Sequence, residues 1–210
     1  MTVRRIPRRP DTDDPRWTSE VEPAPGELRI VQAFVNSAGP WTKTEELTSP
    51  KVLARWLLRW RLVSEEVCRD PAELTDADLD RAVALREGMR AMLRANNGGK
   101  LAEKAVTAFD RAAAEVPLRL RVDGAEGAPY LTAASGGVAG LGRLLGLFAA
   151  ARLSESWIRF KACADGRCGA AFYDDSRGLL RKWCSARCAN RFAARGYRRR
   201  RGIRPRGKAR

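Results

Sequence analysis

The placement of four cysteines near the C-terminal end constrains this 210-residue chain more than any other feature. They form two close pairs with the spacing C-x4-C-x15-C-x3-C: Cys163, Cys168, Cys184 and Cys188. Four thiolates complete the tetrahedron of a structural zinc site and leave no position open for a catalytic water. Clustered cysteines in a reducing compartment indicate a metal more often than disulfides. The pattern therefore predicts a Zn²⁺ site, with two disulfides or four unrelated buried thiols as the alternatives.

The residues around the cysteines predict a small finger. Asp165-Gly166 is typical of a turn that brings the first pair of sulfurs to one centre. A helix is expected to begin at the second pair, because a C-x3-C step places Cys188 one turn after Cys184. A hairpin is expected between the pairs, with its two strands and its turn at 169–173, 179–183 and 174–178. The turn that carries the first cysteine pair at 163–168 (the knuckle), the hairpin and the helix, in this order, describe a treble-clef-like finger.

Positive charge is concentrated behind the finger. The net charge is +15, and residues 176–210 contain 14 of the 40 Lys and Arg and none of the Asp and Glu. A localised basic segment is the electrostatic footprint of nucleic-acid binding. Helical spacing places four arginines on one side of the predicted helix: Arg187, Arg191, Arg195 and Arg198. Cys188 and Phe192 are expected to share another face, turned toward the zinc and the hairpin.

Two kinds of nucleic-acid contact are compatible with this helix. Arginine binds guanine and asparagine binds adenine in the major groove, so Arg191 and Asn190 are candidates for reading bases. The same arginines would equally bind phosphates without reading sequence. The end of the helix and the tail 202–210 are expected to hold phosphates through Arg198, Arg199, Arg200 and Arg201. Asn190 has a second interpretation, in which its amide caps a loop of the finger or holds the hairpin.

The composition disfavours several other classes of protein. The chain contains no histidine, which removes the common nucleophile–histidine catalytic arrangements, and we expect no enzyme. Residues 1–26 lack the apolar segment of a signal peptide and are expected to form a disordered arm. The apolar stretch 138–153 is shorter than the roughly 20 residues that span a bilayer. We therefore expect a cytoplasmic, nucleoid-associated protein with reduced thiols, in which Cys68 is a free buried cysteine.

The region 27–156 reads as a mainly helical regulatory domain with one short β hairpin, an α+β arrangement. Thr48 or Ser49 is expected to cap a helix that begins at Pro50 and runs to Val63. Thr75 and Asp78 resemble a capping box. The further helices are expected at 75–95, 101–116 and 138–153, the last capped by Ser135, and the hairpin at 118–132. Ser154 to Ser156 is interpreted as a linker to the finger at 157–201.

Residues 163–201 resemble the CGNR zinc finger, whose four-residue signature stands here as Cys188-Ala189-Asn190-Arg191. The runs Tyr173-Asp174 and Arg181 to Ser185 also agree with it, whereas Ala189 replaces the signature glycine. Upstream, Phe34-Val35-Asn36, the helix 54–62 and Ala84 to Glu87 resemble the ABATE domain that accompanies this finger. The resemblance implies a bacterial, stress-related transcription regulator with an N-terminal sensing domain. It makes Asn36 and Arg86 candidates for a ligand pocket. Their alternative roles are a loop-capping amide and an internal ion pair with Glu87 or another acid.

Three functions remain open from the sequence. The leading hypothesis is a zinc-dependent, sequence-specific DNA-binding regulator, with a small-molecule effector, a partner or homodimerisation controlling it. The second is an RNA-binding or ribosome-associated protein, because a small zinc module and an Arg-rich tail serve that role equally well. The third is a protein-interaction module in which the zinc is only architectural, and 14 uncompensated cations argue against it.

Overall fold

The computed structural model describes residues 21–39, 44–63, 74–116, 118–122, 129–133 and 138–202. It is mainly helical with short antiparallel strand pairs, which confirms the predicted fold class. The helices are α1 (Leu28–Asn36), α2 (Pro50–Arg59), α3 (Asp76–Asn96), α4 (Glu103–Ala114), α5 (Val138–Leu153), the 3-10 helix η2 (Glu155–Arg159) and α6 (Ala186–Arg200). The strands are β1 (Ala38–Gly39), β2 (Thr44–Glu45), β3 (Leu118–Val122), β4 (Pro129–Ala133), β5 (Phe160–Ala162) and β6 (Ala171–Tyr173). These strands form three pairs, β1–β2, β3–β4 and β5–β6.

Local capping chemistry sets where the helices begin. Ser49 is the N-cap of α2 and accepts a hydrogen bond from the Val52 N–H at 3.3 Å. The predicted capping box of α3 is present, with the Thr75 hydroxyl and the Asp78 carboxylate each accepting from the other residue's backbone. Helix α2 ends at Arg59, so the expected continuation to Val63 is wrong. The chain turns there because Arg61 adopts a left-handed conformation with φ of 54°.

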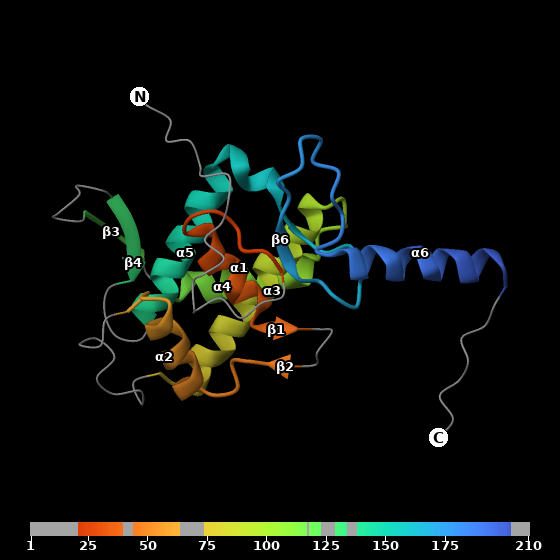
Figure 1. Ribbon diagram of the computed structural model, residues 1–210. Coiled ribbons are helices and arrows are strands. Elements are labelled where there is room, and N and C mark those ends of the chain that lie inside the picture. Colours follow the sequence, from red (N-terminus) through yellow and green to blue (C-terminus); the bar gives the residue numbers. More distant parts are fainter. Residues whose placement is uncertain are drawn as a thin grey trace, which may run out of the picture.

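The core joins the helices to the finger. Side chains of α1, α2, α3 and α5 form one buried cluster that also includes Trp157, Phe160, Ala162 and Ala171. Most of the expected linker at 154–156 is instead part of η2, which begins at Glu155. Trp157 of η2 is buried against Phe148, with ring centroids 5.4 Å apart. In Figure 1, α1 lies between α5 and β6. The finger hairpin is therefore packed into the main core and is not tethered by a flexible segment.

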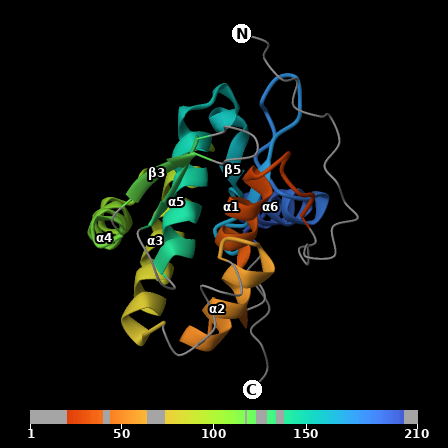
Figure 2. The ribbon, with the colours of Figure 1, turned by 90° about the vertical axis from the view of Figure 1, so that its left-hand side faces the viewer.

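The second hairpin lies at the other end of the molecule. Strands β3 and β4 form the predicted hairpin, in which Leu120 lies opposite Leu131. Strand β4 lies directly on α5, because a Cβ atom at Gly146 would stand 2.7 Å from the Leu131 Cβ. Figure 2 shows this hairpin beside α5 and α4, with α6 on the far side of the body. The turn of this hairpin and the cap at Ser135 lie outside the described residues.

Candidate metal centre and basic helix

The first cysteine pair sits on a tight backbone turn that follows β5. The Cys168 N–H donates to the Asp165 carbonyl at 2.7 Å, and the Cys163 N–H donates to the Ala170 carbonyl at 2.8 Å. Gly169 closes the turn with φ of +57°, a conformation that side chains rarely adopt. These bonds turn both sulfurs toward one point, as the Asp165-Gly166 pattern predicted.

The second pair sits at the start of α6. Ser185 is the N-cap, and its hydroxyl accepts from the Cys188 N–H at 3.4 Å. Cys184 therefore precedes the helix and Cys188 lies in its first turn. The two pairs are joined through the backbone, because the Ala164 N–H donates to the Lys182 carbonyl at 2.9 Å.

The four sulfurs lie close enough together to hold one metal ion. All four cysteines are buried, and their Sγ atoms lie within 4.8 Å of one another. The Cys168 Sγ is 3.6 Å from Cys184 Sγ, which is 3.7 Å from Cys188 Sγ. Four sulfurs bound at about 2.3 Å to one tetrahedral zinc ion would lie about 3.8 Å apart, so the cluster fits that ion. All four thiols are free, which contradicts the disulfide alternative. Cys68 lies outside the described residues.

The thiols interact strongly before any metal is considered. Hydrogen bonds from Cys168 and Cys184 lower the pKa of Cys163, because they stabilise its thiolate. The same thiolate raises the pKa of Cys168 and of Cys184. A thiolate is thus favoured at Cys163 and opposed at Cys168 and Cys184. A divalent cation held by all four sulfurs would remove this opposition, because its charge would stabilise every thiolate.

The finger hairpin differs from the prediction in its pairing. Strand β6 pairs with β5, which precedes the first cysteine, with Lys161 opposite Phe172. The segment 179–183 forms no strand, and Leu179 at its start adopts a left-handed φ of 54°. Instead, the Lys161 ammonium holds this segment by donating to the Leu179 carbonyl at 2.6 Å. Strand β5, which is three residues long, is not among the strands predicted from the sequence.

A buried ion pair supports the loop between the cysteine pairs. Lys161 Nζ lies 2.7 Å from Asp174 Oδ2, and both side chains are buried. Asp174 also accepts from the Ser176 hydroxyl at 2.5 Å and from the Arg181 N–H at 3.1 Å. Burial alone would raise the pKa of Asp174, but the hydrogen bonds from Lys161 and Ser176 outweigh it and lower the pKa. The sequence showed Tyr173-Asp174 only as a family motif, without indicating this partner.

The predicted row of arginines on α6 is divided by a buried acid. Arg191 Nε lies 2.9 Å from Asp165 Oδ2, and Arg195 Nη2 lies 2.9 Å from Asp165 Oδ1. The Arg191 Nε–H is not aimed at the oxygen, so that contact is an ion pair without a hydrogen bond. Arg191 Nη2 also donates to Cys188 Sγ at 2.9 Å. The structure thus directs Arg191 and Arg195 to Asp165, and their role in binding nucleic acid stays a prediction.

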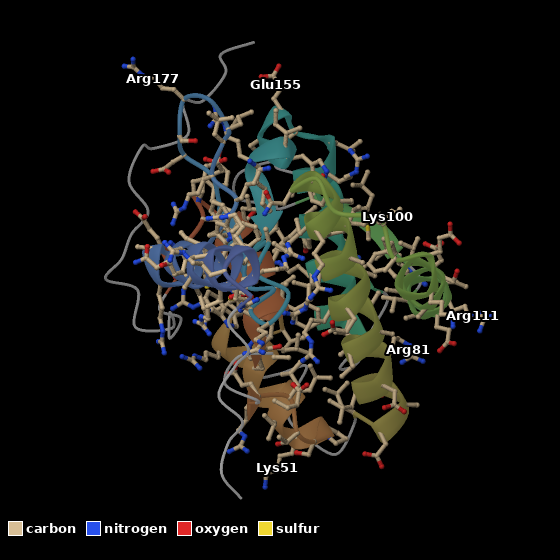
Figure 3. All side chains as sticks on the ribbon, turned by 90° about the vertical axis from the view of Figure 1, so that its right-hand side faces the viewer. Lys51, Arg81, Lys100, Arg111, Glu155 and Arg177 are labelled. Atoms are coloured by element: carbon tan, nitrogen blue, oxygen red, sulfur yellow. The ribbon has the colours of Figure 1, made fainter. Side chains whose placement is uncertain are left out.

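The rest of the basic helix faces solvent. Figure 1 shows α6 projecting from the body, and Figure 3 views the molecule from the side toward which it projects. Phe192 is 53 % exposed, although its ring contacts Trp183 at a centroid distance of 5.2 Å. The Arg201 guanidinium lies over the Tyr197 ring at 5.4 Å. The exposed polar candidates are Arg187, Asn190, Arg198, Arg199, Arg200 and Arg201. The tail from 203 onward lies outside the described residues.

Asn36 joins α1 to the finger. Its amide nitrogen donates to the Ala171 carbonyl at 3.1 Å, and its amide oxygen accepts from the Ala171 N–H at 2.7 Å. The Arg90 guanidinium donates to the Gly169 carbonyl at 3.2 Å, and Asn97 donates to the carbonyls of Ala162 and Lys182. Side chains of α1 and α3, together with the Asn97 that ends α3, thus hold the backbone of the finger. The structure gives Asn36 this bridging role, and a ligand contact stays a prediction.

Arg86 is engaged inside the helical region. Its guanidinium makes two 2.7 Å contacts to Glu45 and a 3.1 Å contact to Glu87. Burial would lower the pKa of Arg86, but the two carboxylates outweigh it and raise the pKa. The predicted internal ion pair with Glu87 or another acid is confirmed, and the ligand role stays a prediction.

Two protein-family models match the chain, one over the helical region and one over the finger. The ABATE model, described as “Putative stress-induced transcription regulator”, matches residues 28–157, which is more than half of the chain. The chain belongs to the ABATE family. The CGNR zinc finger model matches residues 159–201, which include all four cysteines and α6. Both predicted resemblances are thereby confirmed. Among curated proteins, no relative of this ABATE protein was found.

Among the described residues, no helix is both long and apolar enough to cross a membrane. Helix α5, the most apolar segment, is instead buried in the core through residues such as Leu141 and Leu144.

Proposed function

We propose that the protein is a zinc-dependent DNA-binding transcription regulator in which α6 contacts the DNA and the helical region controls it. The observation that carries the proposal is the combination of a buried four-cysteine cluster with a projecting helix whose outer end is wholly basic. The segment from 176 onward has no acidic residue that would neutralise it. An α-helix of this kind fits the major groove of B-DNA.

The helical region is suited to a controlling role because it grips the finger directly. Asn36, Arg90 and Asn97 bind the finger through its backbone. A change in α1 or α3 would therefore move the base of α6. The family description of a stress-induced regulator supports the same assignment. We propose no enzymatic activity, a Zn²⁺ ion at the thiols, and a cytoplasmic, nucleoid-associated location.

The test is to sequence the genomic DNA and the cellular RNA that the tagged protein retains, with Cys184→Ser as the control. The proposal expects a few sharp DNA peaks that share a motif and disappear in the control. Recovery of mainly RNA, or a diffuse DNA signal without a motif, would refute sequence-specific DNA binding. Binding to duplex DNA and to structured RNA at matched salt then identifies the preferred nucleic acid.

A further inference from the structure

We infer that Asp165 is a positioning residue that fixes the direction of α6 through Arg191 and Arg195, so that contact with the nucleic acid falls to a second stripe of the helix. This role rests on the proposed function and deepens it. Two groups of side chains on α6 then have different roles. One group sets the direction of the helix, and the other contacts the nucleic acid.

The inner stripe consists of Cys188, Arg191 and Arg195, which follow one another at steps of three and four residues. Cys188 ties the first turn of α6 to the metal cluster. Arg195 ties the helix to Asp165 two turns after Cys188, about 10 Å further along the axis. Two attachments at that separation define a direction, whereas the metal alone would define a point.

Asp165 is itself held firmly. Its carboxylate has no exposed surface. Its Oδ1 accepts from the Arg167 N–H at 3.2 Å, and its carbonyl accepts from Cys168 and Gly169. A buried carboxylate requires a counter-charge, and Arg191 and Arg195 supply it. The acid is thus part of the knuckle, and the helix is attached to it.

The outer stripe runs alongside the inner one, about a quarter of a turn around α6. Its members recur at steps of three and four residues: Arg187, Asn190, Ala194, Arg198 and Arg201. The four polar members of the stripe are exposed in the structure. Ala194 in the middle of the stripe is small, which permits a close approach to a groove wall. The stripe combines phosphate-binding and base-reading side chain types.

The lever arm of α6 shows why its direction matters. From Cys188 to Arg201 the helix extends about 20 Å, at roughly 1.5 Å per residue. A tilt of about 20° at its base would therefore displace its tip by roughly 7 Å. The major groove is only about 12 Å wide. A helix free to tilt by that amount would lose its register on the bases.

The experiment compares matched Arg→Ala variants of one helix. Arg191→Ala and Arg195→Ala remove the attachment, whereas Arg187→Ala and Arg198→Ala remove the same charge from the outer stripe. Each zinc-loaded variant is checked for metal content. The dependence of duplex affinity on salt is measured for each variant, and the orientation of α6 relative to α3 is measured by residual dipolar couplings.

We expect opposite patterns in the two pairs. The outer variants should flatten the slope of log affinity against log salt by about 0.9 for each phosphate that the helix no longer neutralises, with the orientation of α6 unchanged. The inner variants should keep the wild-type slope, bind more weakly and show a broadened orientation of α6. An equal flattening of the slope in all four variants, or a rigid α6 in both inner variants, would overturn the role of Asp165.

A second variant protects the test against misfolding. Asp165→Asn keeps the shape of the side chain and its bond to Arg167 while removing the charge. It should broaden the range of orientations of α6 in the same way as the inner variants. If the wild-type protein binds no nucleic acid, the proposed function fails, but the dipolar couplings still decide whether Asp165 orients α6. The two failures are therefore distinguishable.

Discussion

The Lys161–Asp174 pair offers the sharpest test of how the finger is held together. In Lys161→Met, an apolar chain of similar length replaces the ammonium that lies 2.7 Å from the buried Asp174 carboxylate. Breaking a buried pair in this way costs about 3–5 kcal/mol of the free energy of unfolding, because an uncompensated charge stays buried. The Leu179 carbonyl also loses its 2.6 Å donor. At about 2–4 °C per kcal/mol for a chain of this size, the midpoint of thermal unfolding should fall by about 6–20 °C.

The assay is thermal unfolding with the zinc concentration held constant, since bound metal adds to the apparent stability. The control is the double variant that carries both Lys161→Met and Asp174→Asn. It removes both charges and should recover much of the stability. A destabilisation below about 1 kcal/mol for Lys161→Met would place the pair in the class of weak exposed ion pairs. That result, or a double variant as unstable as the single one, would refute the reasoning.

The pH dependence provides an independent check of the same pair. The pKa of Asp174 is lowered in the folded protein, so its stabilisation is fully present above the unfolded pKa of about 3.9. It is lost as the pH falls through the folded pKa. In Lys161→Met, burial would raise the pKa of Asp174, and the deficit relative to the wild type should shrink as the pH falls. A deficit that grows toward acid pH would contradict this assignment.

Three further predictions concern other parts of the molecule. Asn36→Ala should cost about 1–3 kcal/mol in denaturant unfolding, because the Ala171 N–H loses its acceptor and the Ala171 carbonyl keeps only the Gln32 amide as a donor. An effect near zero would mean that Asn36 does not hold the finger. Thr75→Ala should cost about 1 kcal/mol because it removes the N-cap of α3, and no change in the denaturation midpoint would contradict that cap. Removal of zinc by a chelator should lower the far-UV helix signal by the share of α6, and Cys184→Ser should show the lowered signal before any chelator is added.

Much of the candidate site could be predicted from the sequence because its determinants are local. The cysteine spacing, the turn at Asp165-Gly166 and the start of a helix at the second cysteine pair are short-range patterns whose geometry follows from the backbone. The same holds for the capping box at Thr75 and Asp78, and for the basic character of α6. Each needs only neighbours within a turn or two.

Only the tertiary structure decided which residues distant in the sequence contact one another. Asp165 meets Arg195 across 30 positions, and Asn36 meets Ala171 across 135. Lys161 forms an ion pair with Asp174, and β5 pairs with β6. The hydrophobic pattern and the charge of a segment do not encode such partners, since they depend on how the whole core packs. For that reason the sequence determined that the chain carries a metal finger with a basic helix, whereas the tertiary structure decided which arginines contact Asp165 and which remain exposed.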